Sequence, residues 1–151
     1  MPFHSPSTPV RRATKTIAFT GAAGLGAVGT VTVFTITGRV YIEPIVCFCT
    51  ETLEEAAPTA TVALGVADDT DAFIGPVNAT TVALNDWWTA AVSLPGAVTS
   101  GAAAGSGATT SSHWKAVSDN IIITVGAQNV TNGTLIFDCF YTPLTDDGAL
   151  T

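Results

Sequence analysis

The chain has 151 residues, of which 47% are hydrophobic and only 11% are charged. This length fits one domain with a core of its own, which needs no disulfide or metal to hold it together. The formal net charge of −7 argues against nucleic-acid binding, because that depends on Lys and Arg residues that neutralise phosphates. The surface is expected to be mostly Thr, Ser, Ala and Gly, which suits either packing against other subunits or a neutral β-protein.

The first residues differ in charge from the rest of the chain. Arg11, Arg12 and Lys15 precede the first acidic residue, Glu43. Residues 1–15 also contain three prolines and show no hydrophobic period, which predicts an extended arm that is disordered in isolation. We expect the three basic residues of this arm to contact a partner.

Two motifs after the arm imitate functional signals. The arginine pair and the weakly hydrophobic stretch that follows it resemble an export signal, but no small-x-small cleavage site is present. Gly24, Gly26 and Gly29 have the spacing of a dinucleotide-binding loop, yet a β-branched run follows where that motif needs a helix. The glycines therefore predict a flexible loop between two strands, and no cofactor is expected. No run of 18 apolar residues suggests a membrane-spanning helix.

Residues 16–151 predict a single all-β domain, an antiparallel β-sandwich of either jelly-roll or Ig-like topology. Its alternating apolar stretches are typical of short strands. The strands are expected at residues 30–43, 45–49, 59–67, 73–74, 80–84, 121–125 and 134–141. Gly38 leaves open whether the first of these is one long strand or two short ones.

Three connections between these strands carry specific expectations. Residues 51–57 fit one or two helical turns, with carboxylates near the start. Gly75-Pro76 should separate two short strands. The final two strands predict a hairpin, closed by a turn region over residues 126–133 that ends in Asn132-Gly133.

A Gly/Ala/Ser/Thr tract over residues 99–112 predicts a long flexible loop. Trp87 and Trp88 precede this tract, and Trp114 follows it. Three roles are open for these rings: core packing, anchoring an interface, or stacking on a sugar. Together with Arg11, Arg12 and Lys15, they are the candidate interface residues.

No arrangement typical of catalysis or metal binding is evident. His113 follows two serines, but there is no nucleophile elbow to hold a reactive hydroxyl. Asp68, Asp69 and Asp71 lack the glycine and distal glutamate of an EF-type loop, so a solvated turn explains them better than a calcium site. The sequence predicts a protein that is not an enzyme and that carries neither metal nor cofactor.

The three cysteines, Cys47, Cys49 and Cys139, do not have the spacing of a zinc site. Cys47 and Cys49 lie two residues apart in a strand-like run, so they should share one face without bridging each other. Buried free thiols are expected, while a bridge from Cys139 to one of the other two stays open.

Four segments are distinctive: residues 37–42, residues 60–74, residues 120–125, and the ending over residues 133–148, which contains Phe-Asp-Cys-Phe-Tyr followed by Pro-Leu-Thr-Asp-Asp-Gly. Together they resemble small structural proteins encoded by tailed bacteriophages. The resemblance covers residues 30–148, and its motifs are structural rather than catalytic. The sequence departs from that family in its longer basic arm and in the insert at residues 99–112.

This resemblance implies a virion structural protein, assembled in the host cytoplasm, whose partner is the major capsid protein or another virion protein. A head decoration or cement protein on the outer capsid lattice is the first expectation. The shortage of charge favours a homo-oligomer, and a trimer suits the three-fold positions of an icosahedral shell. Nucleic acid and membrane are not expected as partners. The alternatives are a tail or fibre-associated virion protein and a carbohydrate-binding β-sandwich that uses the tryptophans.

Overall fold

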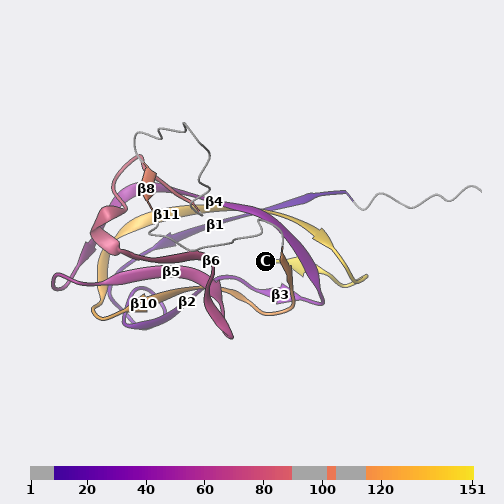
Figure 1. Ribbon diagram of the computed structural model, residues 1–151, viewed down its shortest axis with the longest axis horizontal. Coiled ribbons are helices and arrows are strands. Elements are labelled where there is room, and N and C mark those ends of the chain that lie inside the picture. Colours follow the sequence, from indigo (N-terminus) through magenta and orange to yellow (C-terminus); the bar gives the residue numbers. More distant parts are fainter. Residues whose placement is uncertain (1–8, 90–101, 105–114) are drawn as a thin grey trace, which may run out of the picture.

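The computed structural model describes residues 9–89, 102–104 and 115–151. Two sheets face each other in these residues, as Figure 1 shows, and this confirms the predicted all-β sandwich. One sheet has six strands in the order β1-β11-β4-β7-β8, with β9 also paired to β4. Its strands are β1 (Arg11–Ala18), β4 (Val40–Glu55), β7 (Trp87–Thr89), β8 (Ala102–Ala104), β9 (Lys115–Val117) and β11 (Val130–Pro143).

The second sheet has four strands in the order β2-β10-β5-β6. They are β2 (Gly29–Phe34), β10 (Ile121–Gly126), β5 (Thr61–Val66) and β6 (Asp69–Asn78). All pairings are antiparallel except the one between β7 and β8. The core lies between the sheets and is filled by every second residue of the strands, because successive side chains of a strand point to opposite faces.

A short clasp holds the C-terminus on the sandwich. β12 (Ala149–Leu150) pairs with β3 (Ile36–Thr37), and the backbones of Thr35 and Thr151 exchange two hydrogen bonds of 2.8 and 3.0 Å. Between β3, which belongs to this two-stranded sheet, and β4 of the six-stranded sheet the chain turns at Gly38, whose φ is +63°. Residues 30–43, for which the sequence left open one long strand or two short ones, therefore belong to separate strands.

The predicted helical turns at residues 51–57 are wrong, because β4 continues to Glu55. Its ladder with β11 runs from Val40 opposite Pro143 to Glu55 opposite Val130. Leu53 is fully buried, so this stretch alternates as a strand does. The long neighbouring strand supplies hydrogen-bond partners that an isolated helical turn lacks, which overrides the local preference.

The predicted break at Gly75-Pro76 is also wrong. β6 runs through both residues and ends at Asn78, after which Ala79–Thr81 forms one turn of 3-10 helix, η1. β6 is one of the two outer strands of its sheet, and an outer strand tolerates a proline because one of its edges needs no N–H donor.

The final two strands do not form the predicted hairpin. β10 pairs with β2 and β5 in the four-stranded sheet, whereas β11 pairs with β1 and β4 in the six-stranded sheet. The connection therefore crosses between the layers. Gly133 is not in a hairpin turn but within β11, where the register with β4 shifts and its φ is +113°.

The glycine-rich stretch after β1 is a turn packed on the sandwich. Val130 N–H donates to the carbonyl of Gly26 at 2.8 Å, and Val28 N–H donates to Oδ1 of Asn129 at 3.0 Å. A Cβ on Gly26 would collide with the Val130 carbonyl. β2 follows this turn directly, so no helix opens at the glycines as a pyrophosphate site requires.

Candidate interaction surface

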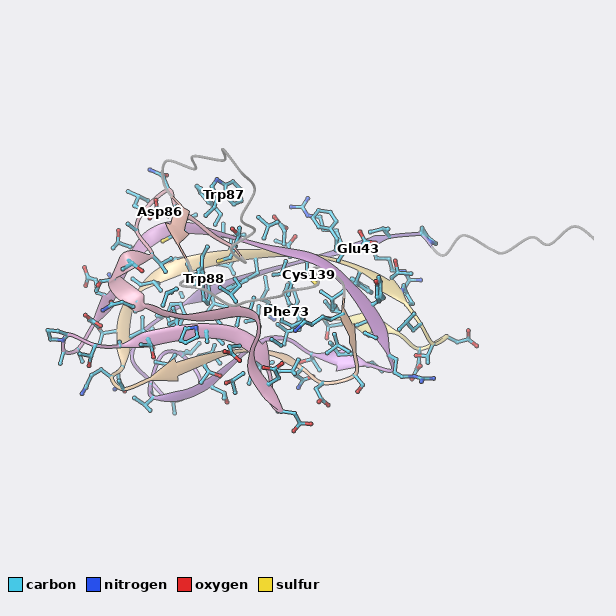
Figure 2. All side chains as sticks on the ribbon, viewed as in Figure 1. Glu43, Phe73, Asp86, Trp87, Trp88 and Cys139 are labelled. Carbon is cyan, nitrogen blue, oxygen red and sulfur yellow. The ribbon has the colours of Figure 1, made fainter. Side chains whose placement is uncertain are left out.

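The two adjacent tryptophans of β7 lie on opposite faces of the six-stranded sheet. Trp88 has no exposed surface, and its ring meets the ring of Phe137 edge-on, with centroids 6.3 Å apart. Trp87 is 46% exposed and packs on Phe48, with centroids 4.7 Å apart. Figure 2 shows Trp87 projecting away from the sheet and Trp88 pointing between the layers. Of this pair, only Trp87 can reach a partner.

Trp87 belongs to a row of apolar side chains on the outer face. In register, Ile136 of β11 lies opposite Phe48 of β4, which lies opposite Trp87 of β7. Ile136 and Phe48 are half-buried. We call Phe48, Trp87 and Ile136 the outer aromatic patch. Phe140 lies further along the outer face of β11 and is 37% exposed. No described strand or helix covers this face, and an exposed apolar patch of this kind is typical of a contact surface.

The outer aromatic patch was only partly foreseen from sequence. Trp87 was a candidate, whereas Phe48 and Ile136 were missed. The signal was the period of two: Cys47 and Cys49 were assigned to one face, which already places Phe48 on the other. The third candidate ring, Trp114, and also His113 lie outside the described residues.

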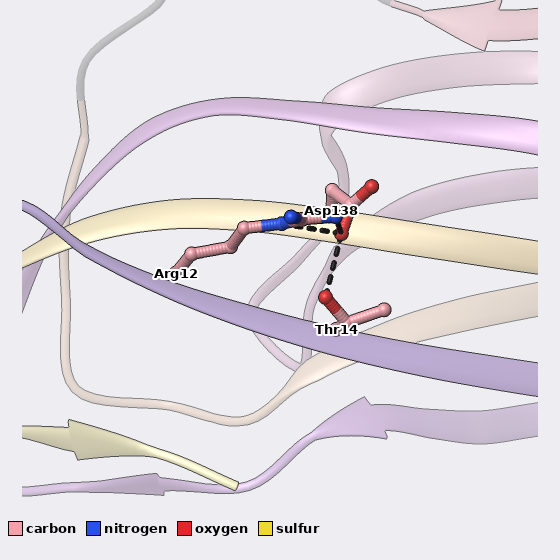
Figure 3. Close-up of polar contacts among 3 residues, drawn as sticks. All are labelled: Arg12, Thr14 and Asp138. Atoms are coloured by element: carbon pink, nitrogen blue, oxygen red, sulfur yellow. Dashed lines mark hydrogen bonds and ion pairs between the residues drawn. The ribbon is translucent and has the colours of Figure 1, made fainter.

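Arg12 lies on the outer face and is held within the chain. Its guanidinium donates to Oδ1 of Asp138 through Nε at 2.9 Å and Nη2 at 2.7 Å, and the hydroxyl of Thr14 donates to the same oxygen at 2.6 Å (Figure 3). The hydrogen bond from Thr14 and the contacts from Arg12 lower the pKa of Asp138 below its usual value. This cluster joins β1 to β11.

Arg11 and Lys15 have a different environment from Arg12. Both are exposed and lie at the opposite parity of β1, the side shared with Ala13 and Ile17. Among the described residues neither one forms an ion pair. Residues 11–15, which the sequence analysis expected to be part of an extended arm, belong to β1 and pair with β11. The cations of Arg11 and Lys15 therefore lie on strand β1.

The three thiols are buried and free. Cys47 and Cys49 share the inner face of β4, as expected from their spacing, and Cys139 lies on the inner face of β11. Burial raises the pKa of all three thiols, that of Cys139 to about 12. They therefore pack as small apolar side chains and are poor nucleophiles.

In the described part of the chain, no group of three His, Cys, Asp or Glu residues is placed to hold a metal ion. The only insert-tract residues described, Ala102–Ala104, form β8 beside β7. None of the described helical structure is long and apolar enough to cross a membrane.

Comparison with known proteins agrees with this fold. No protein-family model matches the sequence, and no curated protein matches it. The structure is similar to a chain of the "Cyanophage Pam1 capsid asymmetric unit", with a TM-score of 0.54 and 20% sequence identity. The similarity covers 94% of this chain and 90% of that chain. At this identity the comparison establishes a shared fold.

Proposed function

We propose that this chain is a structural protein of a tailed-bacteriophage virion, and that it decorates the outer head lattice as a cement protein. The observation that carries the proposal is the fold shared over nearly the whole chain with a component of a cyanophage capsid. The phage-like segments at residues 60–74 and 133–148 support it, and they form parts of β5, β6 and β11.

The surface of the sandwich supports a binding role rather than a catalytic one. The outer aromatic patch offers a neutral apolar contact. Only 11% of the residues of the chain are charged, so few charged side chains would have to lose water when a partner binds. A homotrimer at three-fold lattice positions would repeat one such contact in closed symmetry. The partner would be the major capsid protein or another virion protein.

The proposal is tested with purified particles. Mass spectrometry should find the chain in hundreds of copies per particle, and recombinant chain should co-sediment with heads that lack it. Trp87→Ala should weaken that co-sedimentation, while Leu84→Ala, which removes another exposed apolar side chain, serves as the matched control. A few to a few dozen copies would instead support a tail or fibre position. Absence from the particle would overturn the proposal.

A second candidate function rests on the exposed ring of Trp87. An open indole braced by Phe48 could stack on a sugar ring, as in a carbohydrate-binding β-sandwich. Glycan-array binding that disappears in Trp87→Ala and survives in Leu84→Ala would favour this function. Co-sedimentation with heads without any glycan signal would favour the capsid.

A further inference from the structure

One outer strand of each sheet is charged, and the two charges are opposite. β1 and β8 are the outer strands of the six-stranded sheet, and β2 and β6 are those of the four-stranded sheet; of these four strands, β1 is basic and β6 is acidic. β1 neighbours β2 across the layers, which places β6 on the other side of the sandwich. In Figure 1, β1 runs out toward the right and the β5–β6 turn projects at the bottom.

β1 is a regular strand whose second edge is open. It pairs with β11 over all eight residues without a register shift, and no described strand pairs with its other edge. It contains no proline, and most of its residues are exposed. A long edge of this kind is a template for another strand. It carries Arg11, Arg12 and Lys15, three of the five basic residues of the chain.

β6 presents the opposite charge on the other side. It begins with Asp69 and Asp71, next to Asp68 in the turn, and all three carboxylates are exposed. None of them forms an ion pair within the described residues. The nearby ammonium of Lys115 lies over the ring of Phe73 instead, 5.8 Å from its centroid. No described strand pairs with the outer edge of β6, and its first residues precede Pro76.

We infer that β1 of one copy of this chain pairs with the start of β6 of a second copy. The cations of β1 then face the carboxylates of β6, and both strands gain the hydrogen-bond partners that their open edges lack. Among the described residues, Arg11, Lys15, Asp69 and Asp71 form no ion pair, so their contact would break no described pair.

The geometry of such a contact determines the kind of assembly. It joins two different surfaces on opposite sides of the same molecule, and a contact of that type forms a closed ring when its rotation closes. The inference deepens the proposed virion function, on which it rests for the expectation that the chain self-assembles. Pairing of β1 with another β1 is disfavoured, because it would gather the cations of both copies.

A charge-swap experiment on the full chain tests the pairing. Arg11→Glu with Lys15→Glu, and separately Asp69→Lys with Asp71→Lys, should each raise the dissociation constant of the oligomer about tenfold or more. The chain that carries all four substitutions should recover the oligomer, because the charges are exchanged between the two edges. Arg39→Glu and Glu54→Lys alter exposed charges elsewhere and should leave the mass unchanged.

Light scattering across a concentration series gives the mass, and circular dichroism verifies that each variant is folded. The pairing would be overturned if the unmodified chain were a monomer at every concentration, or if the chain with all four substitutions stayed dissociated. If the chain is a monomer and Arg11→Glu with Lys15→Glu abolishes its binding to heads, the partner of β1 is instead an acidic strand of another virion protein. An oligomer that fails to bind heads would support the pairing and contradict the proposed function alone.

Discussion

The two faces of the six-stranded sheet carry similar aromatic pairs in opposite surroundings. On the inner face Trp88 and Phe137 are both fully buried. On the outer face Trp87 and Phe48 touch each other but stay partly open to water. Trp87 and Trp88 are chain neighbours of the same type, so composition does not distinguish them. Their position in the alternation of the strand decides which one stabilises the fold and which one is available to a partner.

β11 repeats this contrast with ionisable side chains. Cys139 is buried between the layers, and burial raises the pKa of its thiol to about 12. Its neighbour Asp138 faces outward, where the hydroxyl of Thr14 and the guanidinium of Arg12 lower the pKa of the carboxyl. The pKa values of two adjacent residues therefore shift in opposite directions. The thiol of Cys139 is removed from water, whereas the carboxylate of Asp138 accepts hydrogen bonds that stabilise its charged form.

The largest expected effect is a difference between the two tryptophans. Trp88→Ala removes a fully buried ring and should lower the free energy of unfolding by about 3–5 kcal/mol. Trp87→Ala loses mainly its contact with Phe48 and should cost about 1 kcal/mol. Urea unfolding followed by far-UV circular dichroism gives both values.

The milder Trp88→Phe keeps an aromatic ring and guards against a variant that does not fold. It also removes the buried indole N–H, which has no hydrogen-bond partner among the described residues. Its cost should therefore fall well below that of Trp88→Ala. Equal costs for Trp87→Ala and Trp88→Ala would contradict the assignment of the two faces.

The next effect concerns the inner thiols at alkaline pH. In the unfolded chain a thiol ionises near pH 8.5, whereas Cys139 in the folded chain keeps its proton up to a pKa of about 12. Between these values the unfolded state binds fewer protons, so stability should fall as pH rises. The loss is at most about 1.4 kcal/mol per pH unit for this thiol. Urea unfolding at several alkaline pH values measures it.

Cys139→Ala is the control, because it removes one of the three ionising thiols and should reduce the fall of stability with pH, while the contributions of Cys47 and Cys49 remain. A thiol reagent offers a second readout: the folded protein should react slowly, and the unfolded, unreduced protein should yield all three thiols. An unchanged alkaline slope in Cys139→Ala would argue against the burial of this thiol.

The sequence was sufficient for the fold class and for the alternation of inner and outer side chains around Cys47 and Cys49. Period-two alternation placed Cys47 and Cys49 on one face, and that face is the inner one. It was insufficient where pairing partners decide. Residues 51–57 have a local preference for helix, but β11 provides a ladder that extends β4 to Glu55. Local preference does not report which distant strand will lie alongside.

The same limit explains the false hairpin. Neighbouring strands in sequence pair often, and Asn132-Gly133 is a typical turn signal. In this sandwich each of β10 and β11 already has two partners in its own sheet. The interface candidates were affected similarly: sequence grouped Arg11, Arg12 and Lys15, but only a pairing register reveals that Arg12 meets Asp138.

The smallest expected effect concerns the outer carboxyl of Asp138. Its folded pKa is lowered, so its contribution to stability is present above the unfolded pKa near 4 and is lost as pH falls through the folded pKa. The side chain of Arg12 is 58% exposed, which keeps this contribution below about 1 kcal/mol. Carboxyl titration by NMR should find a higher pKa for Asp138 in both Thr14→Val and Arg12→Ala. The shift in Arg12→Ala should shrink in high salt, because salt screens an exposed charge pair, while the shift in Thr14→Val should persist. If neither substitution changes the pKa of Asp138, the hydrogen bonds from Arg12 and Thr14 to this carboxylate do not form in solution.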